Sequence, residues 1–177
     1  MSMIEVQIND KETHEYASGI TAGDILLNVY GKRNGAVAAN INGVERDMSF
    51  IINDNCKIEP ILGDSEEGLY ILRHSCAHLL AQAVVEMFPD AKPTIGPPIE
   101  HGFYYDFHMK PIGDNDLKKI EKRMGQLVRE NITIQREEHE NNDLREMFKE
   151  NKFKIEIMDE KIGNEVGSTA YRQGDFV

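Results

Sequence analysis

One long apolar segment, residues 69–88, constrains the fold of this chain more than any other feature. It contains twenty residues and only two formal charges, those of Arg73 and Glu86. Apolar residues recur in it at steps of three and four, which predicts a helix with one stripe facing a core. The predicted stripe consists of Leu72, Cys76, Leu79, Leu80, Ala83 and Met87.

The other side of this predicted helix carries two histidines, His74 and His78. They are four residues apart and therefore lie one above the other. Because Ala81 and Val85 flank them, this side is not a charged, solvated face, and we expect another part of the protein to cover it. The spacing alone leaves three interpretations open: hydrogen-bonded core histidines, two ligands of a metal ion, or two proton-handling groups in a cleft.

The composition is that of a globular protein. With 177 residues, 40% hydrophobic and 29% charged, the chain has room for one domain of common size and a smaller one. No apolar run approaches the about 18 residues of a membrane span, and the first residues lack a basic region followed by an apolar one. We therefore expect a cytoplasmic protein that does not associate with membranes.

Charge and cysteine content exclude two further classes. The formal net charge of −11 argues against a broadly basic surface for nucleic acid, so a nucleic-acid partner would be held locally. The two cysteines, Cys56 and Cys76, fall in different predicted domains and form no Cys-x-x-Cys motif. Neither a disulfide scaffold nor a thiolate zinc site is indicated.

Residues 1–62 predict a small domain with the order strand, strand, helix, strand, strand, strand. The helix begins after Thr21, whose pairing with Asp24 resembles a capping box, and ends at Gly31. Turns are expected at Asn9-Asp10 and at Asn42-Gly43, the latter a strong hairpin signal. This order favours a ubiquitin-like β-grasp fold, with the helix packed across a mixed sheet. The expected strands are residues 4–8, 12–16, 37–41, 50–52 and 56–61.

Residues 63–68 are polar and bounded by glycines, which predicts a linker, and residues 69–177 form the second predicted domain. After the histidine helix, the chain predicts an extended Gly-Pro-Pro loop and an aromatic strand over residues 103–107. An amphipathic helix over residues 117–128 follows. The remaining expected elements are strands at 132–134, 153–157 and 169–172 and a short helix at 144–150.

Two segments of this second domain closely resemble the editing domain of bacterial threonyl-tRNA synthetases. They are Arg73-His74-Ser75-Cys76-Ala77-His78-Leu79-Leu80 and residues 95–106, which contain Gly-Phe-Tyr-Tyr-Asp. Residues 1–62 resemble the TGS domain that precedes the editing domain, and residues 152–160 resemble a later editing-domain strand. The resemblance implies an α+β protein, in which a β-grasp domain precedes an editing domain with its histidine helix against a mainly antiparallel sheet.

In that family the domain hydrolyses serine wrongly attached to the threonine tRNA. Serine lacks a single methyl group of threonine, which is worth only about 1 to 3 kcal/mol of discrimination, so a second site must remove the error. Hydrolysis of this ester needs a positioned water, a group that takes its proton, and donors for the developing oxyanion.

The resemblance assigns four residues of this chain to the site. His74 and His78 match the family's histidine pair, with His74 nearest the ribose hydroxyl and the water and His78 shaping the pocket. Lys154 matches a lysine that places a cation near the seryl group, and Tyr104 lies in the matched aromatic strand as a substrate-binding residue. Without the resemblance, Lys154 would be interpreted as a solvated strand lysine and Tyr104 as a wall residue. His101, where the family often has asparagine, is expected in a loop without a catalytic part.

The resemblance also implies that this chain is an N-terminal piece of a threonine–tRNA ligase. The family continues after Val177 with an aspartate, a cysteine and a histidine that complete the pocket, and then with the core that binds ATP and zinc. We therefore expect weak or no editing from this piece, and no cofactor in it. Its expected partner is the aminoacylated 3′ adenosine of tRNA; the piece is expected to be monomeric and the whole enzyme a homodimer.

Two other functions remain open at this stage. One is a zinc-dependent hydrolase built on His74 and His78, although no third ligand is evident and zinc normally takes at least three protein ligands. The other is a non-catalytic module that binds RNA or a protein. Elemental analysis tests the first, and a seryl-tRNA deacylation assay tests the second.

Overall fold

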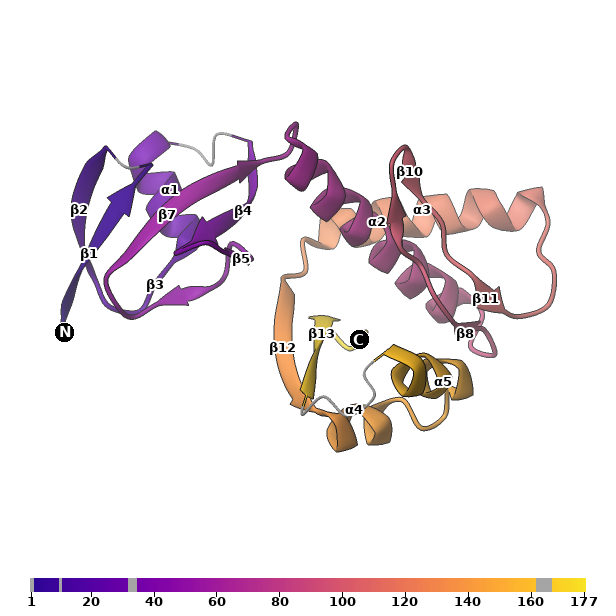
Figure 1. Ribbon diagram of the computed structural model, residues 1–177. Coiled ribbons are helices and arrows are strands. Elements are labelled where there is room, and N and C mark those ends of the chain that lie inside the picture. Colours follow the sequence, from indigo (N-terminus) through magenta and orange to yellow (C-terminus); the bar gives the residue numbers. More distant parts are fainter. Residues whose placement is uncertain (1, 10, 32–34, 162–166) are drawn as a thin grey trace. The chain divides into compact units, whose positions relative to one another are not determined.

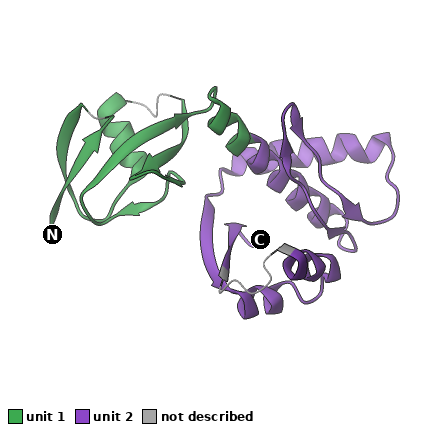
Figure 2. Cartoon of the chain, viewed as in Figure 1, with its two compact units in different colours: residues 1–72 green, residues 73–177 purple. Residues whose placement is uncertain are grey.

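The computed structural model of the protein describes residues 2–9, 11–31, 35–161 and 167–177 (Figure 1). It divides into two compact units, residues 1–72 and residues 73–177 (Figure 2). Helices and strands are mixed in both, which confirms the predicted α+β class. Within the described residues, no helix combines the length and the apolar character that a membrane crossing requires.

The first unit contains a mixed five-stranded sheet with the strand order β2-β1-β7-β4-β5. Strand β1 is antiparallel to β2 and parallel to β7, and β4 is antiparallel to both β7 and β5. A further antiparallel pair joins β3 and β6. The strands are β1 (Met3–Ile8), β2 (Glu12–Ala17), β3 (Ile20–Thr21), β4 (Ala36–Ile41), β5 (Val44–Arg46), β6 (Ile51–Ile52) and β7 (Cys56–Leu62).

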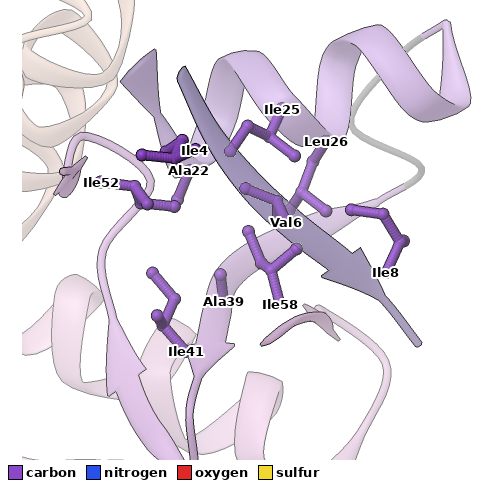
Figure 3. Close-up of a cluster of buried hydrophobic side chains, with 10 residues drawn as sticks. All are labelled: Ile4, Val6, Ile8, Ala22, Ile25, Leu26, Ala39, Ile41, Ile52 and Ile58. Atoms are coloured by element: carbon purple, nitrogen blue, oxygen red, sulfur yellow. The ribbon is translucent and has the colours of Figure 1, made fainter. Parts of the chain in front are cut away.

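Helix α1 (Ala22–Tyr30) packs on this sheet and closes the core of the first unit. Ile25 and Leu26 of the helix are fully buried together with Val6 and Ile58 of the two parallel strands (Figure 3). Every second residue of β1 is buried, as the predicted alternation requires.

Local sequence signals fix the ends of α1 and the turn after β4. The Asp24 backbone N–H donates to Thr21 Oγ1 at 3.1 Å, and Gly31 ends the helix with a φ of 68°. Asn42 and Gly43 both have positive φ, 51° and 84°, as a two-residue hairpin turn between β4 and β5 needs. These predictions are confirmed, whereas Asp10 of the other predicted turn lies outside the described residues.

The second unit combines helices with three separate pairs of antiparallel strands, β8 with β11, β9 with β10, and β12 with β13. The predicted antiparallel pairing is present, but no single sheet joins these pairs in the part of the chain that the structure describes. The elements are α2 (Glu66–Met87), β8 (Lys92–Pro93), β9 (Pro98–Ile99), β10 (Gly102–Phe103), β11 (Phe107–His108), α3 (Asp114–Glu130), β12 (Ile134–Glu140), α4 (Asn141–Met147), α5 (Lys152–Lys161) and β13 (Gly167–Gln173).

Two clusters of apolar side chains hold this unit. One lies where α2 packs against α3, and its most buried members are Ala83, Val84, Ala91, Ile120 and Leu127. The other joins α4, α5 and β13 through Leu144, Met158 and Ala170.

Helix α2 differs from its prediction at its N-terminal end. It begins at Glu66, so the second half of the predicted linker is helical, and the two units divide at residues 72 and 73, inside the helix. Leu72 and Cys76 of the predicted core stripe are exposed, whereas Ala77 and Ala81 are fully buried. The stripe is right for the C-terminal half, where Leu79, Leu80, Ala83 and Met87 belong to the core cluster.

The prediction of a strand over residues 153–157 is wrong, because these residues belong to helix α5. The alternation of apolar and charged residues there also fits a helix. Ile155 and Met158, three residues apart, both pack into the cluster of Leu144 and Ala170. The predicted aromatic strand is likewise divided into β10 and β11, with residues 104–106 between them.

Gly68→Ala tests the start of α2. A Cβ atom at Gly68 would lie 1.8 Å from the Leu62 carbonyl oxygen, so we expect this change to lower the free energy of unfolding by about 1 to 3 kcal/mol. Gly125→Ala in α3 is the matched control, because its Cβ meets only ordinary contacts and should stabilise the helix by about 0.5 to 1 kcal/mol. Urea denaturation measures both, and equal effects would contradict the described helix start.

Candidate functional site

The two histidines of α2 are in direct contact. Their Nε2 atoms are 3.2 Å apart, and their ring centroids are 4.9 Å apart. A hydrogen bond between two imidazoles needs one N–H and one lone pair, so this contact holds when at least one ring is neutral. Two positively charged rings at this distance would repel each other.

Tyr171 of strand β13 covers the histidine pair. Its ring meets His74 and His78 edge-on, with centroid distances of 5.8 Å and 6.0 Å. Ala81, one turn further along α2 on the same side, is fully buried. The expectation that another part of the protein covers the histidine side of the helix is therefore confirmed.

Lys154, the third residue of α5, is near enough to His78 for its charge to act on that ring. Its Nζ donates to the Tyr105 hydroxyl at 3.5 Å and lies 6.0 Å from the centroid of the Phe148 ring. Burial lowers the pKa of Lys154 from its ordinary value. The structure thus brings together three of the four residues that the sequence singled out, from two helices far apart in the chain.

Burial keeps the histidines neutral at pH 7. It lowers the pKa of His74, and it is the main reason that the pKa of His78 falls to about 4. The positive charges of His74 and Lys154 add to the effect on His78. A neutral imidazole can accept a proton, and here it stands next to a lysine cation.

The fourth residue, Tyr104, lies in the stretch between β10 and β11 and is 45% exposed. Its neighbour Tyr105 contacts Lys154 instead, stacks on Phe107 at 4.8 Å between centroids, and has a pKa raised to about 12 by burial. Gly96 makes room for this ring, since a Cβ there would lie 2.1 Å from it.

The sequence analysis missed two residues of this site, Tyr105 and Tyr171. Tyr105 falls within the predicted aromatic strand without being singled out, and only the glycine of the Gly-Pro-Pro loop hints at a ring packed against it. Nothing local to Tyr171 marks its contact with α2, because the two lie almost a hundred residues apart.

The donors present do not complete a metal site. Among the described residues, no three side chains of the types His, Cys, Asp or Glu gather as ligands of a metal ion need to. Zinc takes three or four protein ligands, so His74 and His78 alone do not fit it.

His101 lies in the turn between β9 and β10, as expected, near Glu100 on an exposed surface.

Comparison with known proteins places this chain in a class. No family profile matches the chain. Curated relatives include a protein of Thermoplasma acidophilum, 43% identical over 89% of this chain and 24% of its own length. A second, from Rubrobacter xylanophilus, is 38% identical over 98% of this chain and 27% of its own. A third, from Streptococcus thermophilus, is 39% identical over 99% of this chain and 28% of its own.

These relatives are aminoacyl-tRNA synthetases, and the chain is related to that class of enzyme along nearly its whole length. All three are named threonine–tRNA ligase, and the chain belongs to the threonine–tRNA ligase family. It spans about a quarter of the length of these relatives. The resemblance found in the sequence is confirmed at this level.

The partly buried histidine pair makes stability depend on pH. The folded pKa of His78 is about 4 and its ordinary value is 6.5, so the unfolded chain binds an extra proton between these values. We expect the free energy of unfolding to fall by about 2 kcal/mol as the pH decreases from 6.5 to 4.

Urea denaturation at several pH values measures this loss, and His78→Gln should remove most of it. His101→Gln, at an exposed histidine, is the control and should leave the pH dependence unchanged. The same slope in all three chains would contradict the burial of His78.

Proposed function

We propose that the second unit is an editing domain, which hydrolyses the ester between serine and the threonine tRNA, and that the first unit is a TGS-like β-grasp domain. Membership in the threonine–tRNA ligase family supports both assignments. The mixed sheet of the first unit, with parallel β1 and β7 side by side and one helix on the sheet, supports the assignment of a TGS-like β-grasp domain. The observation that carries the proposal is the direct contact of His74 with His78, near enough to Lys154 for the lysine charge to act on the His78 ring.

In the proposed reaction, His74 lies nearest the ribose hydroxyl and the attacking water. Its neutral imidazole takes a proton from the water as the water attacks the ester carbon, and returns that proton to the ribose oxygen when the ester bond breaks, which releases serine and the tRNA. His78 orients His74 through their Nε2 contact: when the His74 Nε2–H donates to His78 Nε2, the lone pair of His74 is on Nδ1, where it can take the proton of the water. His74 can take the proton only if its ring starts neutral. Burial favours the neutral form of both rings at pH 7, because it lowers the pKa of each.

Lys154 supplies the electrostatic part of the mechanism. Attack on the ester places negative charge on the former carbonyl oxygen, and a cation fixed nearby stabilises that charge more in the transition state than in the substrate. Partial burial strengthens the interaction, because less water screens it. The reaction proposed here uses no cofactor from this chain.

Substrate recognition is assigned to the two tyrosines. Tyr104 stays a prediction for a contact with the substrate, and its exposure leaves its ring available. Tyr105 acts on the chemistry indirectly by holding Lys154. The partner is the aminoacylated 3′ end of tRNA in the cytoplasm, and the net charge of −11 implies that basic surfaces elsewhere in the longer relatives hold the rest of the tRNA.

Seryl-tRNA deacylation tests the proposal. The assay uses the chain alone and the chain inserted in place of the matching region of the Streptococcus thermophilus relative. His74→Ala and Lys154→Met should each slow hydrolysis by about 100-fold or more in the active form while leaving threonine charging nearly unchanged. His101→Ala is the control and should edit like the parent.

Other outcomes point to other functions. Hydrolysis that a chelator abolishes, together with zinc in elemental analysis, would support a zinc hydrolase. Binding of tRNA without hydrolysis in both forms would support a non-catalytic module. Loss of threonine charging with His74→Ala would contradict separate sites for the two reactions.

A further inference from the structure

Asn151 makes hydrogen bonds at both ends of its side chain. Its Oδ1 accepts from the backbone N–H groups of Phe153 at 3.2 Å and Lys154 at 3.4 Å, which caps the first turn of α5. Its Nδ2 donates to the carbonyl oxygen of Pro93 in β8 at 2.8 Å. One amide thus joins the start of a helix to a strand 58 residues away in the chain.

This link lies between the two partners of one contact in the candidate site. Lys154 belongs to the turn that Asn151 caps, so the position of that turn decides where its ammonium reaches. Pro93 pairs with Phe107, on which the ring of Tyr105 stacks. Asn151 therefore ties the helix that carries Lys154 to the strand pair that supports Tyr105.

The backbone around Tyr105 is held to the same strands. The N–H of Thr94 donates to the Asp106 carbonyl oxygen, and the N–H of Asp106 donates to that of Ile95, both at 2.9 Å. Movement of β8 is thereby transmitted to the residue next to Tyr105. These bonds do not set the distance from the β8–β11 strand pair to α5. The side-chain amide of Asn151 spans that distance.

Asparagine suits this position because its side chain offers an acceptor and a donor together. Serine, threonine and aspartate also cap helices, but serine and threonine are too short to reach a second partner in this direction, and aspartate has no donor. A cap alone would not require an amide.

We propose that Asn151 is a positioning residue, which sets the Lys154 ammonium against Tyr105 and the histidine pair by bonding α5 to β8. Its role in a reaction rests on the proposed editing function, whereas its role in placing Lys154 does not. Without the bond to Pro93, α5 keeps its cap but loses its fixed distance from the strands. The Lys154 ammonium then moves toward solvent, away from Tyr105 and His78.

NMR titration of the 177-residue chain tests the placement. Asn151→Ser and Asn151→Thr keep a capping oxygen and remove the donor to Pro93. The Lys154 side chain, followed through its labelled Cε, should titrate closer to the ordinary 10.5 in both variants than in the parent. The groups that face it are Tyr105, His74 and His78, and the His78 ring should titrate at higher pH once the lysine charge has moved away.

Thr21→Ala is the matched control, because it removes the cap of α1 in the first unit and should leave both titrations unchanged. Parent-like titration of Lys154 in the two folded Asn151 variants would overturn the proposal. Unfolding of both variants would also overturn it, since the amide would then support the whole unit rather than one side chain.

Deacylation kinetics provide the second arm. In the form that edits, Asn151→Ser should lower kcat by about tenfold or more with little change in KM, because Lys154 stabilises charge that develops only in the transition state. An unchanged kcat would overturn the catalytic part. If the parent hydrolyses no seryl-tRNA even when it is inserted in the longer relative, the proposed function fails, and the titrations still decide the placement of Lys154.

Discussion

Removal of charged groups from water is the constraint on which the second unit depends. Burial is the main cause of the lowered pKa values of His74, His78 and Lys154, three groups from two helices. Buried polar groups cost stability unless they find partners. The partners here are the other imidazole, the edge of Tyr171 and the hydroxyl of Tyr105, so the elements that carry them must meet at one place.

Charged pairs at the far end of α2 hold the same helix in position. Glu86 accepts from Gln82 at 3.0 Å and from the Arg123 guanidinium of α3 at 2.6 Å, and Arg123 also bonds to Glu130 at 2.7 Å. Gln82 and Glu86 continue the four-residue spacing of the histidines. One side of α2 therefore carries the histidines at one end and the contact with α3 at the other. This contact fixes the rotation of α2 about its axis.

Predictions from the sequence are most accurate where interactions between neighbouring residues decide the structure. The cap at Thr21, the turn at Asn42-Gly43 and the alternation in β1 act within a few residues, and all are confirmed. The strand prediction for residues 153–157 failed because so short a segment fits both the strand period and the helix period. The burial of Met158 against residues from other elements decides for the helix.

The candidate site shows the same limit of local signals. The histidine pair was predictable from one helix, because its spacing is local. The partners Tyr105 and Tyr171 depend on how distant segments meet, and no pattern in the sequence records that. A resemblance to a family could place Lys154, but the tyrosine that holds the lysine was visible only in the structure.

The 3.2 Å contact between the two Nε2 atoms also makes protonation of one histidine depend on the other. The first proton taken up by the pair is shared in a bond between rings, and a second must break that bond and add charge to charge. The two rings therefore do not take up their protons independently of each other. Protonation of one ring thus makes protonation of the other harder, and their contacts with each other and with Tyr171 offer no carboxylate to either ring.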